Sequence, residues 1–166
     1  MDHADLVGLL RPGVDGAGGR WADLGAGEGA FTLALSELVG PTAHITAVDK
    51  DARALRGLNG RFEVKVADFT GRLDLHDLDG VVMANSLHFV REKGPVLIKV
   101  RGMLKPKGRL IVVEYGGDRG NPWVPYPFSY PRWEKMAAEA GFQETRLLAT
   151  IPSRYFGSMY SALSVA

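Results

Sequence analysis

The amino-acid sequence predicts an α/β domain built on a mostly parallel sheet that helices cover on both faces. Short apolar runs alternate with stretches of helical spacing through most of the 166 residues, which is the pattern of successive β-α units. Several of the apolar runs end in polar residues, and the chain closes on two extended runs around a turn. A chain of this length without an internal repeat forms one domain.

Composition excludes several classes of protein. The 20 Lys and Arg residues balance 19 Asp and Glu residues without a basic cluster, so binding to DNA is not indicated. The absence of cysteine excludes disulfides, thiolate nucleophiles and cysteine-based metal sites. The acidic start is not a signal sequence, and no run approaches the roughly 20 apolar residues of a membrane span. We therefore expect a cytoplasmic protein with no membrane partner.

The first β-α unit follows a short N-terminal segment. Residues 1–20 hold at most one short helix, which Pro12 ends before a glycine-rich stretch. The apolar run at 20–24 predicts a strand, and the helical spacing at 30–39 predicts a helix after a glycine turn. The β-branched run at 44–48 predicts the second strand. These elements form the first parallel unit of the sheet.

The same pattern repeats through the middle of the chain. A short helix is expected at 51–58, followed by strands at 61–67 and 80–84 that run into polar residues. Helical spacing predicts a helix at 95–104, which a Lys-Pro-Lys-Gly stretch ends before a strand at 109–114. The parallel sheet is therefore expected to continue through these strands.

The last third of the chain breaks this rhythm. Residues 115–128 carry glycines, prolines and large aromatic side chains without periodicity, and they predict an ordered loop. A helix at 132–140 follows. Extended runs at 144–151 and 155–163, separated by Pro-Ser-Arg, predict a terminal β-hairpin.

The glycine turn after the first strand predicts a ligand site. In an open parallel sheet, ligands bind beyond the carboxyl ends of the strands. Gly25 and Gly27 allow positive φ angles and let a ligand approach the backbone at the start of a helix. Asp49, 22 residues beyond Gly27, ends the second strand and is placed to accept both hydroxyl protons of a ribose.

Polar side chains also close the third and fourth strands. Asp68 suits an exocyclic amine, Phe69 suits packing on a flat ring, and Asn85 ends the fourth strand. Asp68 and Asn85 could instead be turn residues, and Asp49 could serve only its own short helix. The joint placement of these residues at successive strand ends favours a ligand-binding function.

Five motifs give the chain from Trp21 to Ala166 a specific resemblance. They read DLGAGEG at 23–29, VDK at 48–50, ADF at 67–69, MANSLHFV at 83–90 and LKPKGRLIVVE at 104–114. With them the chain resembles class I S-adenosylmethionine-dependent methyltransferases. The resemblance implies a Rossmann-like, doubly wound, seven-stranded sheet of order 3-2-1-4-5-7-6 with an antiparallel last strand. That family usually has two glycines in the helix-stop motif, whereas Lys107 takes one of their places here.

The resemblance also implies roles for individual residues. The methionine part of S-adenosylmethionine would lie over the glycine turn, the ribose on Asp49, and the adenine between Lys50 and Phe69. The implied cofactor-binding residues are Asp23, Gly25, Ala26, Gly27, Asp49, Lys50, Asp68, Phe69 and Asn85. The single domain, 1–166, would divide into a short N-terminal segment at 1–20, a cofactor-binding part at 21–114, and an acceptor loop, helix and hairpin at 115–166.

Two alternative functions remain open. The G-x-G-x-x-A pattern at 25–30, with Asp49 on a ribose, also fits an NAD(P)-type dinucleotide-binding protein. Asp23 disfavours that alternative, because a carboxylate two residues before the first glycine suits an ammonium group and repels a pyrophosphate. The other alternative is a non-catalytic cofactor-binding subunit, since only residues 1–20 precede the first strand. A partner subunit or a homodimer could then cover the open site.

The chemistry of methyl transfer points to an acceptor site beside the cofactor. The main task is to align an electron-rich acceptor, and a base is needed only where the acceptor must lose a proton. His88 is the only imidazole on a predicted strand-end loop and is the candidate base. The candidate acceptor residues are His88, Tyr115, Trp123, Tyr126 and Tyr130. The other histidines are scattered without ligand spacing, so no metal is expected.

The loop after the fourth strand also bears on the acceptor. Many base-methylating relatives carry an Asn/Asp-Pro-Pro-aromatic motif there, whereas residues 85–88 read Asn-Ser-Leu-His. This difference argues against amino methylation of DNA bases. We therefore expect a small-molecule acceptor methylated on oxygen, nitrogen or carbon, and the sequence leaves its identity open.

Overall fold

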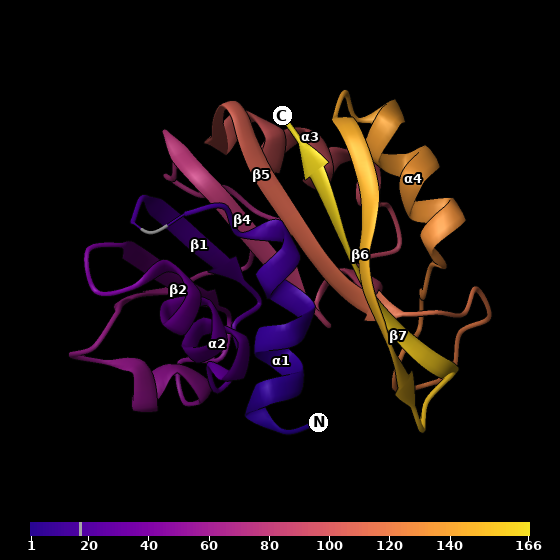
Figure 1. Ribbon diagram of the computed structural model, residues 1–166, viewed down its shortest axis with the longest axis horizontal. Coiled ribbons are helices and arrows are strands. Elements are labelled where there is room, and N and C mark those ends of the chain that lie inside the picture. The colour runs from indigo at the N-terminus through magenta and orange to yellow at the C-terminus, as the bar shows by residue number, and fades with distance from the viewer. Residues whose placement is uncertain (17) are drawn as a thin grey trace.

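Seven strands form one sheet in the computed structural model, which describes residues 1–16 and 18–166 (Figure 1). They are β1 Arg20–Leu24, β2 His44–Asp49, β3 Glu63–Val66, β4 Leu78–Ala84, β5 Leu104–Tyr115, β6 Gln143–Ser153 and β7 Gly157–Val165. The order across the sheet is β3-β2-β1-β4-β5-β7-β6. β1 to β5 pair in parallel, and β7 runs antiparallel to both β5 and β6. The predicted Rossmann-like fold and strand order are confirmed.

Helices cover both faces of this sheet (Figure 1). The α-helices are α1 His3–Leu10, α2 Ala30–Val39, α3 Lys93–Met103 and α4 Tyr130–Glu139, and the short 3-10 helices are η1 Arg11–Gly13, η2 Ala54–Leu58 and η3 Leu87–Phe89. α1 and α2 contribute to one of the two large hydrophobic cores, and α3 and α4 contribute to the other. A small third cluster joins Ala47 of β2 to Leu55 and Leu58 of η2. No described helix has the length and apolarity that crossing a membrane requires.

The two cores follow from the alternation of side chains along the central strands. In β4, Val81 and Met83 pack in the core that contains α3 and α4, whereas Val82 packs in the core of α1 and α2. Because successive side chains of a strand point to opposite faces, a strand covered on both sides reads as a continuous apolar run. The apolar runs predicted as strands are continuous for this reason.

The local differences from the sequence prediction lie at turns. The helix predicted at 51–58 is only the 3-10 helix η2, because the Asp51 side chain accepts a hydrogen bond from the Arg53 backbone and forms a turn first. The Pro-Ser-Arg stretch predicted as the hairpin turn is mostly strand, and the turn moves to 154–156. Phe156 and Gly157 both adopt positive φ angles, which reverses the chain there.

Lys107, which stands where the helix-stop motif usually has a glycine, adopts a backbone conformation that favours glycine. Its φ angle is 64°, in the left-handed region that favours glycine. Its backbone N donates to the carbonyl of Ala166 at 3.2 Å, which ties this turn to the C-terminus. β5 begins at Leu104, so the residues expected only to stop a helix belong to this strand.

Candidate functional site

The glycine turn between β1 and α2 has the left-handed geometry that the sequence predicts. Gly25, Gly27 and Gly29 have φ angles of 82°, 54° and 89°. A Cβ atom at Gly25 would overlap the Ser86 side chain, and one at Gly29 would overlap Leu58. A Cβ atom at Gly27 would meet no atom within 4 Å. Two of the glycines are therefore required by packing as well as by φ, whereas Gly27 faces open space.

Hydrogen bonds to β2 hold this turn in place. The backbone N atoms of Gly25 and Ala26 donate to the carbonyl of Val48 at 2.8 and 2.9 Å. The backbone N of Gly27 donates to Asp49 Oδ2, and that of Asp51 donates to Asp49 Oδ1, both at 2.9 Å. Asp49 is therefore fixed at the end of β2 and joins the turn to the strand beside it.

Asp23 lies beneath the turn. Its side chain is buried, and Asp23 Oδ2 accepts a hydrogen bond from Thr32 Oγ1 in α2 at 2.7 Å. Burial raises the pKa of the Asp23 carboxyl to about 6. Asp23 does not line the cavity that the turn borders. The side chain thus connects the end of β1 to the first turns of α2, and contact with a ligand there remains a prediction.

A cavity of about 500 Å³ opens at the carboxyl ends of β1, β2, β3 and β4. Seven of the nine predicted cofactor-binding residues line it, namely Gly25, Gly27, Asp49, Lys50, Asp68, Phe69 and Asn85. Asp23 and Ala26 are the two that do not. The lining that sequence reasoning missed consists of Ala67, Thr70, Ser86, Phe89 and Val90. We call this space the cofactor cavity, after the ligand that the sequence resemblance implies for these residues.

Two polar groups of the cofactor cavity have unused acceptor capacity. Asp68 Oδ1 accepts from the backbone N and the hydroxyl of Thr70 at 2.9 and 2.7 Å, and these bonds lower the pKa of the carboxyl. Asp68 Oδ2 accepts no hydrogen bond from another described residue. Asn85 has a φ angle of 52°, and its buried Oδ1 has no partner among the described residues. Both atoms can accept hydrogen bonds from a ligand.

A second cavity, of about 630 Å³, adjoins the first. Its lining consists of Asn85, His88, Phe89, Tyr115, Trp123, Val124 and Tyr155. Asn85 and Phe89 also line the cofactor cavity, so the two spaces meet at these residues. The lining is mostly aromatic and carries one imidazole. We call this space the acceptor cavity, after the role that the sequence analysis expects for His88, Tyr115 and Trp123.

His88 is held by a buried carboxylate. His88 Nδ1 lies 2.7 Å from Glu114 Oε2, and both side chains are buried. Glu114 Oε1 accepts from the backbone N atoms of Leu87 and His88 at 3.1 and 3.2 Å. Because a carboxylate only accepts hydrogen bonds, this contact favours a proton on Nδ1 and leaves Nε2 as the acceptor. His88 is thus held at the wall of the acceptor cavity by Glu114, and its role as a base remains a prediction.

The other predicted acceptor residues separate into two groups. Tyr115 and Trp123 line the acceptor cavity with His88. The Tyr126 backbone N donates to the His88 carbonyl at 3.0 Å, but its ring lies beside Lys93 Nζ. Tyr130 donates to Glu134 and packs edge-on against Tyr160, both away from the cavity. The structure does not bring Tyr126 and Tyr130 to this lining.

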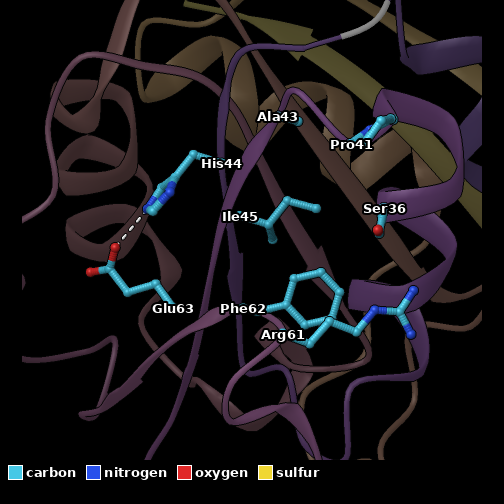
Figure 2. A pocket seen from close by; sticks show the side chains of 9 residues that line it. Ser36, Pro41, Ala43, His44, Ile45, Arg61, Phe62 and Glu63 are labelled. Carbon is cyan, nitrogen blue, oxygen red and sulfur yellow. Dashed lines mark hydrogen bonds and ion pairs between the residues drawn. The ribbon is translucent and has the colours of Figure 1, made fainter.

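A separate cavity of about 310 Å³ lies at the opposite ends of the strands (Figure 2). It borders the first residues of β2 and β3, where His44 Nε2 lies 2.6 Å from Glu63 Oε2. Arg61 and Phe62 line the side toward α2. Among residues 1–16 and 18–166, no three His, Asp or Glu side chains are placed to hold a metal ion. None of the predicted site residues lies here.

Comparison with known proteins assigns the family. The model of a methyltransferase domain matches residues 22–110, which is more than half of the chain and contains the glycine turn and the ends of β1 to β4. The chain belongs to the methyltransferase domain family.

This methyltransferase domain is similar in sequence to a longer methyltransferase. It is 34% identical over 109 residues to the ubiquinone/menaquinone biosynthesis C-methyltransferase UbiE of Pseudomonas savastanoi pv. phaseolicola, covering 59% of this chain and 42% of that protein. The chain thus spans less than half the length of this relative.

Solved structures share the fold at lower identity. An S-adenosylmethionine-dependent methyltransferase of Thermotoga maritima superposes with a TM-score of 0.80 at 18% identity, over 98% of this chain and 88% of that one. One of Aquifex aeolicus superposes with a TM-score of 0.72 at 19% identity, over 99% and 98%. Family membership does not favour the dinucleotide-binding alternative.

Proposed function

We propose that this methyltransferase domain binds S-adenosylmethionine in the cofactor cavity and methylates a small molecule in the acceptor cavity. The observation that carries the proposal is the junction at Asn85 and Phe89, where the two cavities meet. A methyl donor and its acceptor must lie next to each other for direct transfer. The aromatic wall of the acceptor cavity favours an apolar acceptor.

The residues of the cofactor cavity suit the groups of this cofactor. Asp49 would accept from the ribose hydroxyls while it continues to hold Gly27. Asp68 Oδ2 would accept from the adenine amine, and Phe69 would pack on the ring. The unpartnered Asn85 Oδ1 would accept from a polar hydrogen of the cofactor or the acceptor. When bound, S-adenosylmethionine supplies an activated methyl group.

His88 supplies the base for acceptors that must lose a proton. In the proposed reaction Nε2 takes the proton from an O–H or an acidic C–H of the acceptor, and the acceptor atom keeps the electron pair for the new bond. The imidazolium that forms faces Glu114 Oε2 at 2.7 Å, which stabilises its charge. The carbon methylation named for the Pseudomonas relative supports including carbon acids among the acceptors to be screened.

Titration calorimetry with S-adenosylmethionine, its demethylated product, NAD and FAD tests the proposal. We expect binding of the first two and much weaker binding of NAD and FAD. A bound ligand should also stabilise the fold. At a ligand concentration 100 times the dissociation constant, the free energy of unfolding should rise by about 2.7 kcal/mol. Tight NAD binding without a response to S-adenosylmethionine would reverse the assignment. Turnover only in the presence of a second protein would support the non-catalytic subunit instead.

Asp49→Ala is the first variant to test. It should weaken cofactor binding at least about tenfold, because each hydrogen bond to a charged group contributes about 1.5 to 3 kcal/mol. Asp49→Asn keeps one oxygen for the Gly27 N–H and separates loss of the turn from loss of the ribose contact. Asp74→Ala, an exposed carboxylate outside the cavity, is the matched control. Unchanged affinity in folded Asp49→Ala contradicts the ribose assignment.

A further inference from the structure

The exposed aromatic side chains of the described chain gather at one place. Phe89, Trp123, Tyr126 and Tyr155 are the aromatic members of its exposed large hydrophobic residues, with 60%, 77%, 40% and 60% of their surface accessible. Three of them line the acceptor cavity, and the Tyr126 backbone bonds to His88 in the same wall. We call these four residues the aromatic rim. Isolated exposed apolar residues are ordinary, whereas a cluster around an opening marks a contact surface.

Exposed arginines accompany the aromatic rim. Arg91 follows Phe89 by two positions, Arg119 precedes Trp123 by four, and Arg154 directly precedes Tyr155. All three are exposed, and none forms an ion pair with another described residue. Glu92 and Asp118 stand beside Arg91 and Arg119, but Arg132 lies 3.8 Å from Asp118 and pairs with it. The rim segments therefore keep an excess of cationic charge.

We propose that the aromatic rim docks on an anionic lipid surface and that a lipophilic acceptor enters the acceptor cavity from that surface. The inference deepens the proposed function and rests on it for the role of the cavity. It replaces the expectation from the sequence that the protein has no membrane partner. Trp and Tyr favour the interfacial layer of a bilayer, where one part of the ring is apolar and another is wet. Arginines near the surface are attracted to anionic head groups. An apolar acceptor would then pass from lipid to an aromatic wall with little exposure to water.

The shape of the surface favours lipid over a protein partner. The rim residues come from three separate segments, after β4, after β5 and at the β6-β7 turn, and one residue of each segment lines the acceptor cavity. Tyr115 contacts the ring of Tyr155 at 6.0 Å between centroids, so the β6-β7 turn lies against the end of β5. A protein partner bound to the aromatic rim would cover the opening through which the acceptor enters. A lipid surface would instead supply the acceptor there.

Vesicle co-sedimentation tests the charge requirement. The protein should bind vesicles of phosphatidylcholine with 30% phosphatidylglycerol, should not bind phosphatidylcholine alone, and should dissociate as salt increases. Replacing Arg91, Arg119 and Arg154 together by Gln should weaken binding on the order of 100-fold, at about fivefold for each arginine. Arg61→Gln, at the cavity of Figure 2 on the opposite ends of the strands, is the matched control and should change nothing.

Tryptophan fluorescence tests insertion of the rim. Of the three tryptophans, Trp21 and Trp133 are buried and Trp123 is exposed. A blue shift of emission on adding anionic vesicles should therefore come from Trp123. Trp123→Phe should lose the shift and keep most of the binding, whereas Trp123→Asp should lose both. A shift that persists in Trp123→Phe overturns the proposal.

Three further results would also overturn the lipid proposal. They are absence of binding to anionic vesicles, vesicle binding that the triple arginine variant leaves unchanged, and self-association in sedimentation velocity that buries Trp123. Binding to soluble polyglutamate as tight as to vesicles, without an emission shift, would assign the rim to an acidic protein instead. Calorimetry with S-adenosylmethionine on the same samples separates the two proposals. Cofactor binding without vesicle binding rejects docking alone, and vesicle binding without cofactor binding rejects the proposed function.

Discussion

At the scale of single residues, the Asp23 carboxyl ionises less readily in the folded protein than in the unfolded chain. Burial raises its pKa from 3.8 to about 6, so between these values the native state holds a proton that the unfolded state has released. The contribution of Asp23 to the free energy of unfolding should be largest below pH 3.8. It should be lost as the pH rises from 3.8 through 6, by on the order of 3 kcal/mol. Asp23→Asn keeps an acceptor for Thr32 and should remove this dependence.

Denaturant unfolding of both proteins between pH 4 and 7 measures the effect. Only the difference between wild type and Asp23→Asn is informative, because other groups titrate in the same range. Glu139→Gln, at an exposed carboxylate at the end of α4, is the control substitution. Parallel profiles for wild type and Asp23→Asn would show that the buried carboxyl titrates equally in both states.

Glu114 is the second residue whose charge has a predictable consequence. Glu114→Gln keeps an oxygen for the Leu87 and His88 amides but removes the negative charge beside Nδ1. We expect a lower kcat and an altered pH profile, with cofactor affinity nearly unchanged. The decrease in kcat should not exceed the 10²- to 10⁴-fold that is typical for loss of a general base. His88→Gln measures that limit in this protein. Steady-state kinetics that match wild type would leave Glu114 a purely structural role.

At the scale of elements, the glycine turn allows a matched pair of substitutions. Gly29→Ala imposes a strained φ of 89° and an overlap with Leu58 in η2, so it should cost at least about 2 kcal/mol of stability. Gly27→Ala imposes strain alone, about 1 kcal/mol, and its methyl group would point into open space beside the cofactor cavity. Thermal unfolding and calorimetry should therefore separate them. Gly29→Ala should lower stability more, and Gly27→Ala should weaken cofactor binding more.

Elements differ in how far the sequence could predict them. The strands and their polar ends are encoded locally, because apolar runs and the residues that follow them are contiguous. Glu114 also ended a predicted apolar strand, but its partner His88 lies 26 positions earlier, and no periodicity records that pairing. Tyr155 was predicted as the first residue of a strand, and only the shift of the hairpin turn brings it to the acceptor cavity. Long-range pairing and turn geometry account for what sequence reasoning missed.

At the scale of the whole molecule, α1 contributes buried side chains to one of the two large hydrophobic cores. Its residues Leu9 and Leu10 are buried in the core formed by α2 and the sheet. Leu10→Ala should cost about 2 to 5 kcal/mol, the range for a buried leucine. Leu147→Ala on β6, where the side chain is 47% exposed, should cost much less. Chemical denaturation of the two variants compares them directly, and equal losses would mean that α1 is not part of the cooperative core.

The hydrogen bonds of the glycine turn have a consequence for selectivity among metabolites. A turn that cradles phosphate does so with unoccupied N–H groups. Here the amides of Gly25 and Ala26 donate to Val48, that of Gly27 donates to Asp49, and that of Gly29 donates to Ala26. These four amides are already bonded, and the turn holds the Asp49 carboxylate beside the cofactor cavity, so the site should discriminate against anions. Abundant phosphorylated nucleotides such as ATP should therefore compete poorly for this site, even where their adenosine is identical to that of the cofactor.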